Sequence, residues 1–568
     1  MILLASIVLW IAYLLCAMTG YGKYANAQMD DPLAMVDALF PCLNFISLSI
    51  SILGFVCIVY KIENRYLHVL ILTQFSLILW VTPFYLSGFV VSHDTLYHGG
   101  VSSYAPDVLR GGHTYFSGYL ENYPMSFVFN WIFMNIIAAD VPTYGRVVFP
   151  TAISVATAIL MYNFVTKLLN SRVAFASTLL TIPALYAVEI QVSPQSIAVI
   201  LVLTIVSLLY RSDAKSKMLS VLALLVLVVT HPLHPLLLAM LLVAPGIVEW
   251  LTHVRSGVHF SFYVLLLGVA WVAWALFNST AMSFVPLLEG IYHVITFRFA
   301  VYPGEAVYPS RTLFPLFGFL RTYILFSYAA VAFGCGLAYL NLRRIGNTRA
   351  MYKGLISALG PKRLMLITSI LVFLFLTFVL RTSVYEGGIN LAQRSIFYLF
   401  LSLCIFIAST FDEVIHKPVS LGRKALLLVL ICSWVAGIAY IYPLASYYDA
   451  GYSAIPYSEG VGIEFLRHIP SDSAIFTWTL NDLALTSRAP RLELVWLPQD
   501  RSRLPQDLQQ EVENIDAAIF QRGSYYYSIN QDLSFQDNAY TRMHQAVSQS
   551  TTMNRVYSNP SYEIFVKA

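Results

Sequence analysis

The stretch YLHVLILTQFSLILWVTPFYLSGFVVS, residues 66–92, contains no lysine, arginine, aspartate or glutamate. A helix needs about 20 apolar residues to cross a hydrocarbon core of roughly 30 Å, so this stretch is long enough to span a membrane. It is followed at once by HDTLYHGGVSSYAPDVLRGGH, residues 93–113, in which polar, charged and glycine residues are frequent. Together the two stretches predict a membrane helix that delivers a polar loop to one face of a membrane.

The composition of the whole chain extends this prediction. Of 568 residues, 58% are hydrophobic and 11% are charged, and the mean hydropathy is +0.68. Soluble domains carry about 25% charged residues, so this composition excludes an ordinary soluble protein and predicts a multi-pass α-helical protein of the cell membrane. About thirteen segments are apolar enough to form membrane helices: near 3–19, 40–60, 68–90, 147–166, 173–189, 194–210, 218–231, 233–250, 259–277, 315–340, 363–380, 395–411 and 424–442.

The distribution of basic residues predicts the orientation of the chain. Lysine and arginine concentrate in alternate loops, such as those that hold Lys61 and Arg65 or Lys167 and Arg172. Cytoplasmic loops are enriched in these residues, so the polar loop after residue 92 is predicted to be extracytoplasmic. The first apolar segment lacks a preceding basic stretch, which favours an uncleaved helix over a signal peptide.

Three extracytoplasmic loops are expected in the membrane domain, which is predicted to cover residues 1–443. The first, 93–145, contains MSFVFNWIFMNIIAA (125–139), which is too short to span the membrane and is predicted to lie in the outer interface as a helix. The others are 278–314 and 381–394.

Residues 444–568 are predicted to form a small extracytoplasmic α/β domain, because the composition becomes polar there. Apolar residues recur at helical spacing in EGVGIEFLRHI (459–469), whereas other short runs have the pattern of strands. The expected strands are 473–479, 516–521, 554–558 and 562–568.

Asp94 is the strongest candidate for a catalytic residue. It follows an apolar helix and can share a helical face with His98, four positions later. A carboxylate sheltered by the membrane, with its pKa tuned by burial, can act as a general base toward an acceptor hydroxyl. The structural alternative is a helix-capping aspartate, since aspartate is common at helix starts.

Other polar residues of the extracytoplasmic side are candidates for substrate contacts, and each has an ordinary alternative as a loop residue. Their spacing matches no strong metal-binding signature, so we predict no metal cofactor, with a divalent ion as the less favoured alternative. One of these candidates, His231, belongs to THPLHP, where two prolines would break a helix and mark a tight connection. The candidates are His98, Asp107, Arg110, His113, Asn122, Tyr123, Glu189 and His231.

Arg394 is the second candidate for a direct role in chemistry. It stands at the predicted outer mouth of a helix, where a guanidinium can bind a phosphate in bidentate fashion beside an apolar surface for a lipid tail. The alternative is an arginine that snorkels to the interface. Arg381, at the other end of the same loop, is the second candidate for phosphate binding.

The order of these motifs resembles the GT-C class of membrane glycosyltransferases, which includes protein mannosyltransferases, aminoarabinose transferases and catalytic oligosaccharyltransferase subunits. SHDTLYHGG (92–100) resembles the acidic start of the first large exterior loop, NYPMSFVFNWIF (122–133) the interfacial helix, and FVTKLLNSRVA (164–174) the basic cytoplasmic turn. Two departures stand out: an extra helix precedes the one that delivers Asp94, and Asp94 has no second acidic residue beside it, which weakens a metal-dependent mechanism.

The resemblance implies a GT-C-like membrane domain that acts as a hexosyltransferase with a sugar on a polyprenyl phosphate as donor. Asp94 would be the general base, and Arg394 would bind the donor phosphate. The acceptor would be a hydroxyl of a glycan, a protein or a lipid, and the anomeric carbon would be inverted. No basic stripe suited to nucleic acid is present.

Two other interpretations stay open. One is a transporter or flippase for a lipid-linked or small substrate, and the other is a scaffold whose exterior domain binds a partner. Transporters are often built from internal repeats with sites near the membrane midplane. Here no repeat is apparent and the polar residues concentrate at one face, which favours the enzyme.

Overall fold

The computed structural model describes a helical region and a C-terminal sheet. Short gaps occur within some of the described ranges, and a few further short pieces are described between residues 5 and 58. The main described ranges are 62–81, 93–110, 122–182, 192–277, 362–376, 386–416, 474–477, 493–495, 517–521, 544–559 and 562–567.

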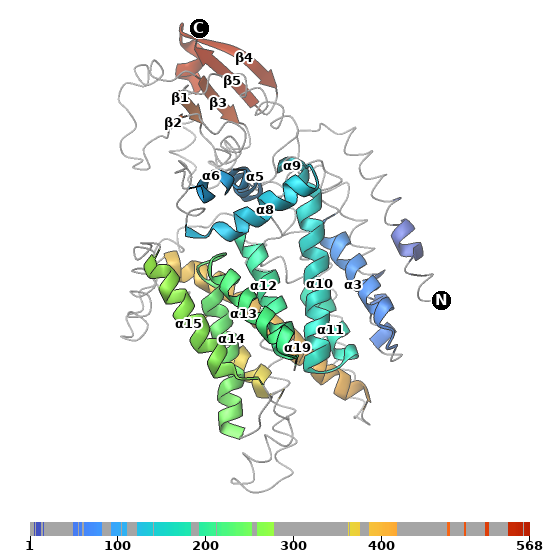
Figure 1. The fold of residues 1–568 in the computed structure, drawn as a ribbon. Helices are drawn as coiled ribbons and strands as arrows, with labels where there is room; N and C mark the ends of the chain where they lie inside the picture. The colour runs from blue at the N-terminus through green and yellow to red at the C-terminus, as the bar shows by residue number, and fades with distance from the viewer. Residues whose placement is uncertain are drawn as a thin grey trace.

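Long helices pack side by side around one apolar core (Figure 1). Neighbours in the sequence pack together, as in the pairs α12–α13 and α14–α15, and α11 also packs against α19 from much later in the chain. The helices are α3 (Arg65–Trp80), α10 (Phe149–Leu168), α11 (Ser171–Thr181), α12 (Pro194–Leu209), α13 (Ala214–Val228), α14 (His234–Thr252), α15 (Phe260–Phe277) and α19 (Glu386–His416).

These helices fall on segments that the sequence predicts to be apolar spans. Among the described residues, α10 and α15 are long and apolar enough to cross a membrane by length and composition. Shorter apolar helical stretches occur at 65–78, 194–209, 234–250, 364–374 and 397–409.

Several helices begin where the sequence supplies a capping side chain. Asn64 accepts a hydrogen bond from the backbone N–H of Leu67 at 3.1 Å, and Asp213 accepts one from Ser216 at 2.8 Å. Such bonds satisfy backbone donors that the first helical turn leaves unpaired.

The structure corrects the extracytoplasmic loop predicted at 381–394, because α19 already begins at Glu386. An acidic residue is favourable at a helix N-terminus, and Leu391, Ala392 and Gln393 are good helix formers. The early start places Arg394 inside the helix, two turns from its beginning, instead of in a loop.

Short helices cover one end of the long helices, which we call the outer end (Figure 1). The interfacial helix predicted at 125–139 corresponds to α8, which buries Phe127 and Asn130 and lies across this end. The elements of the outer end are α5 (His93–Ser102), α6 (Ala105–Leu109), α8 (Pro124–Ile136), α9 (Val141–Thr143) and a π-helix (Tyr144–Val148).

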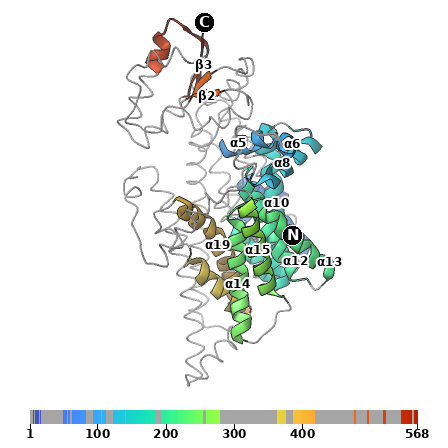
Figure 2. The same cartoon turned by 60° about the vertical axis from the view of Figure 1, so that its left-hand side comes forward.

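The C-terminal strands form a five-stranded mixed sheet of order β2-β1-β3-β5-β4. β1 is parallel to β2 and β3, and β5 is antiparallel to β3 and β4. The sheet lies beyond the outer end (Figures 1 and 2). The strands are β1 (Ala474–Thr477), β2 (Glu493–Val495), β3 (Ala517–Gln521), β4 (Met553–Asn559) and β5 (Tyr562–Lys567).

Four of these strands coincide with the runs expected from the sequence, and β2 was not expected. The three residues of β2 are too few to produce a recognisable alternation. The helix expected at 459–469 lies outside the described residues.

Candidate functional site

A group of polar side chains is buried where α12, α14 and α19 meet. Gln195 lies in the first turn of α12, and Arg394 and Tyr398 lie on α19. His231 lies in the turn before α14, and His234 is the first residue of α14. We call these five residues the polar cluster. All but Arg394, which is half-buried, are nearly inaccessible to solvent.

Arg394 is tied to α12 by a hydrogen bond from its Nε to Oε1 of Gln195, at 3.0 Å. Pro194 occupies the first position of α12, and the Ser193 side chain caps it, so the local sequence fixes where Gln195 stands. An arginine that only snorkels to the interface would not need a buried partner on another helix.

The ring of His231 caps the start of α14. Its Nδ1 accepts hydrogen bonds from the backbone N–H groups of Leu233, at 3.1 Å, and of His234, at 3.4 Å. The indole N–H of Trp271 donates to the carbonyl of Pro232 at 2.7 Å and holds the same turn from α15. The tight connection predicted for THPLHP is therefore present, with its first histidine as a buried cap.

His234 links α14 to α19 through a hydrogen bond between its Nδ1 and the hydroxyl of Tyr398, at 2.7 Å. The rings of His231 and His234 meet edge to face, with centroids 4.6 Å apart. Tyr398 follows Arg394 by one helical turn, so both side chains lie on the same face of α19.

The electrostatics of the polar cluster favour an anion. His231 lies in the turn between α13 and α14, outside both helices, and burial holds the pKa of its imidazole well below the usual value. Nearby charges on His234, Arg394 and His98 act in the same direction. The N-termini of α12 and α14 add partial positive charge. The site therefore combines a cationic guanidinium with neutral imidazole and two helix dipoles.

The helix that carries Asp94 is anchored next to this site. Thr95 of α5 accepts a hydrogen bond from the backbone N–H of Val192, at 3.2 Å, just before α12 begins. The ring of His98 lies 5.6 Å from that of Phe127 on α8. Asp94 precedes Thr95 in α5, and its side chain lies outside the described residues.

The start of α8 lies beside the α13–α14 turn. The backbone N–H of Met125 donates to the carbonyl of Val229 at 3.3 Å. The carbonyl of Asn122 accepts a hydrogen bond from Trp274 at 2.9 Å, and Tyr123, just before α8, is buried. Asn122 and Tyr123 thus lie near the turn that holds His231.

The remaining predicted site residues lie on α6, at its end, or outside the described residues. Arg110 is exposed at the end of α6, and Asp107 belongs to α6 with a side chain outside the described residues. His113, Glu189 and Arg381 also lie outside them. Within the described part of the chain, no group of three or more His, Cys, Asp or Glu side chains is arranged to hold a metal ion.

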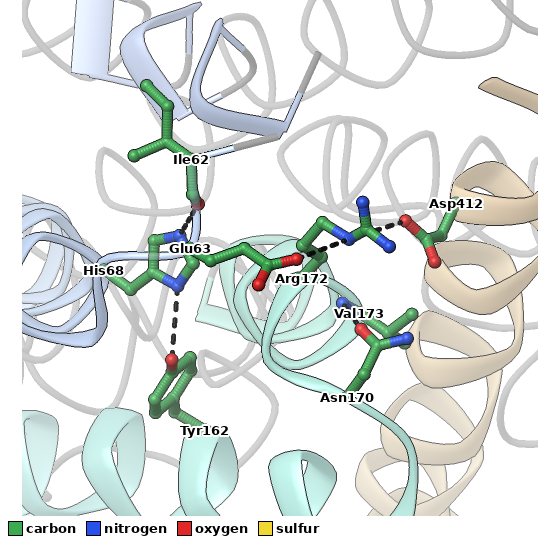
Figure 3. Close-up of polar contacts among 8 residues, drawn as sticks. All are labelled: Ile62, Glu63, His68, Tyr162, Asn170, Arg172, Val173 and Asp412. Carbon is green, nitrogen blue, oxygen red and sulfur yellow. Dashed lines mark hydrogen bonds and ion pairs between the residues drawn. The ribbon is translucent and has the colours of Figure 1, made fainter. Parts of the chain in front are cut away.

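A separate ion network marks the opposite, inner end of the helices (Figure 3). Arg172 lies between Glu63 and Asp412, with Nε–carboxylate distances of 3.5 and 3.4 Å. Asp412 is near the C-terminal end of α19, whereas Arg394 is near its N-terminal end. The polar cluster therefore lies at the end of α19 away from the basic loops that the sequence predicts to be cytoplasmic.

Comparison with solved structures finds low-identity similarity over most of the chain. The chain is similar to the archaeal oligosaccharyltransferase AglB from Archaeoglobus fulgidus in complex with an inhibitory peptide and a dolichol-phosphate, at 11% identity and a TM-score of 0.48, covering 83% of this chain and 71% of that one. It is also similar to ArnT from Cupriavidus metallidurans bound to undecaprenyl phosphate, at 10% identity and a TM-score of 0.46, covering 89% and 99%.

The apo form of the Archaeoglobus fulgidus oligosaccharyltransferase is similar at 12% identity and a TM-score of 0.49, covering 89% of this chain and 75% of that one. No protein-family model matches the sequence, and no curated protein matches it significantly.

Proposed function

We propose that this chain is a membrane-embedded glycosyltransferase that moves a sugar from a polyprenyl-phosphate donor to an acceptor hydroxyl on the extracytoplasmic side. The observation that carries the proposal is the contact between Arg394 and Gln195, at the same end of the helices as α5. Arg394, which we propose to bind the phosphate, and the helix that holds the proposed base thus come from distant parts of the chain to one end of the molecule.

The proposed chemistry is a single displacement. Asp94 takes the proton from the acceptor hydroxyl as its oxygen attacks the anomeric carbon, and the bond between that carbon and the phosphate oxygen breaks. The sugar is inverted, and the polyprenyl phosphate leaves with the electron pair of the broken bond. Arg394 stabilises the negative charge that develops on the phosphate.

Apolar surface next to the outer end suits a lipid-linked donor. On α15, the side chains of Leu265, Val269, Val272 and Leu276 are all exposed. A row of large apolar side chains on one helix face is stable when lipid covers it. A donor with a long isoprenoid tail would reach the site from the same surroundings.

The direct test of the base is turnover by purified protein in lipid nanodiscs, with a panel of polyprenyl-phosphate sugars. Asp94→Asn is expected to slow transfer by about 10²–10⁴-fold, the usual contribution of a general base. Asp213→Asn is the matched control, because Asp213 caps α13 and asparagine is an equally good cap. An Asp94→Asn protein with wild-type turnover would remove Asp94 as the base.

Arg394→Ala tests the phosphate contact in the same assay. It is expected to raise the KM for the donor by at least about tenfold to a hundredfold, the value of a single hydrogen bond to a charged group, while the protein still folds. An unchanged KM would remove Arg394 from the site. A wild type that transfers no sugar but moves an intact substrate across vesicle membranes would favour the transporter.

A further inference from the structure

We propose that His231 is a second ligand of the donor phosphate. The Nε2–H of its neutral ring donates a hydrogen bond to the leaving phosphate, beside Arg394. The identity of the anion rests on the proposed function. The existence of an anion site at this turn can be tested separately from sugar transfer.

The ring of His231 is fixed before any ligand arrives. Its Nδ1 is held by the backbone N–H groups of Leu233 and His234, and the turn is held by the bond from Trp271 to Pro232. A side chain fixed in this way loses little conformational freedom when it binds a ligand.

The same two bonds determine where the proton sits. A nitrogen that accepts from two N–H donors carries no hydrogen, so the neutral ring must carry its hydrogen on Nε2. None of the described residues hydrogen-bonds to this atom. His231 therefore presents a donor that has no partner among the described residues of the site.

A neutral donor fits the charge of this site. A second cation would repel the guanidinium of Arg394, whereas a neutral N–H adds a hydrogen bond without that cost. A phosphate oxygen offers a strong acceptor to both groups. The N-termini of α12 and α14 favour the same anion.

A second observation concerns the neighbouring ring of His234. Nε2 of His234 is buried and has no hydrogen-bond partner among the described residues. Buried polar atoms are rarely left unpaired in folded proteins, so this atom, on the ring that packs edge to face against His231, is a polar group that a ligand at this turn could satisfy.

Two substitutions separate the structural role of His231 from the proposed one. His231→Asn keeps an acceptor near the position of Nδ1, since asparagine is a favoured helix cap, but removes the Nε2 donor. His231→Gln places an amide nitrogen near the position of Nε2 but removes the ring that caps α14. His231→Ala removes both.

The readout is the preference of each protein in nanodiscs for undecaprenyl phosphate over undecaprenol, measured together with thermal melting. Wild type is expected to prefer the phosphate. His231→Asn should melt like wild type but lose about tenfold to a hundredfold of this preference, as expected for one hydrogen bond to a charged group. His231→Gln should melt lower and keep more of the preference than His231→Ala.

The outcomes distinguish this inference from the proposed function. A His231→Asn protein with wild-type preference would show that the ring only caps α14, and would overturn the inference whether or not sugar is transferred. If that variant does not fold, equal preferences of His231→Gln and His231→Ala would overturn it. A preference that depends on His231, in a wild type that transfers no sugar, would support the anion site and overturn the glycosyltransferase.

Discussion

At the scale of single residues, the hydrogen bond between Arg394 and Gln195 sets the orientation of the guanidinium. A guanidinium is planar and binds phosphate through parallel N–H groups, so its plane decides whether both can reach the same anion. The bond to Nε fixes that plane from α12. Gln195 therefore acts as a positioning residue for Arg394.

Substitutions of Gln195 should separate orientation from charge. Gln195→Ala removes the acceptor and is expected to raise the donor KM by about tenfold, the value of one hydrogen bond, with a smaller change in kcat. Gln195→Glu keeps an acceptor but adds a carboxylate that partly neutralises Arg394, so it should melt at least as high as wild type and still bind the donor less well.

Steady-state kinetics and thermal melting of both variants check this prediction. Thr204→Ser, which removes one methyl group from a half-buried residue further along α12 and keeps its hydroxyl, is the control for packing of this helix. If Gln195→Glu binds the donor as well as wild type does, the interaction between Gln195 and Arg394 has no role in phosphate binding.

Sequence patterns reveal some parts of this site and hide others. Ser193 and Pro194 mark the start of α12 in the sequence itself, and the histidines of THPLHP are visible as a doublet. The contact of Gln195 with Arg394 joins residues 199 positions apart, and no local pattern encodes it. Tyr398 lies in an apolar run and gives no signal until α14 packs against α19 and His234 reaches its hydroxyl.

At the scale of elements, the position of α5 depends on a close approach at Gly145. A Cβ added to Gly145 would lie 2.2 Å from Cγ2 of Thr95, well inside van der Waals contact. Thr95 is also the residue that anchors α5 to the start of α12. The absence of a side chain at Gly145 thus allows α5, with Asp94, to approach the polar cluster.

Gly145→Ala is therefore expected to displace α5 and to lower sugar transfer about tenfold or more, because misplacement of a catalytic group by about 1 Å is costly. Gly268→Ala is the matched control, since a Cβ there meets nothing within 4 Å. Alanine should stabilise that helix by up to about 1 kcal/mol and leave turnover unchanged. Equal turnover of the two variants would show that α5 is not held at Gly145.

The helices themselves follow from local sequence, whereas their exact extent does not. The apolar run expected at 194–210 matches α12 closely, whereas α3 and α13 begin three and four residues before the expected spans 68–90 and 218–231. Asn64 and Asp213, which cap these two helices, are polar residues outside the apolar runs. The early start of α19 escapes this reasoning, since its first turns contain two glycines, which have low helix propensity.

At the scale of the whole molecule, α19 connects the two polar ends. Its first half carries Arg394 and Tyr398, and its last turns carry Asp412, which pairs with Arg172 (Figure 3). Arg172 also pairs with Glu63, which precedes α3. The inner network thus joins three segments that are far apart in the sequence.

Removal of Arg172 should destabilise the protein more than removal of an ordinary surface ion pair. The side chain of Asp412 is 16% exposed and would be left without this partner, whereas that of Glu63 is 60% exposed and would be solvated. An exposed pair contributes roughly 0.2–1 kcal/mol and loss of one buried partner costs roughly 3–5 kcal/mol, so we expect about 1–2 kcal/mol for Arg172→Ala. Thermal melting should show this loss of stability. Lys167→Ala, in the last turn of α10, is the control.

The two ends of α19 should respond independently, because α19 packs against α11 and α14 between them and is held there. Sites without shared partners usually add within about 0.5 kcal/mol, so Arg172→Ala combined with Gln195→Ala should lower the free energy of unfolding by the sum of the single effects. Arg172→Ala alone should leave the donor KM unchanged. A raised KM in that variant, or a double mutant that departs clearly from additivity, would show instead that the inner ion network controls the position of Arg394 through α19.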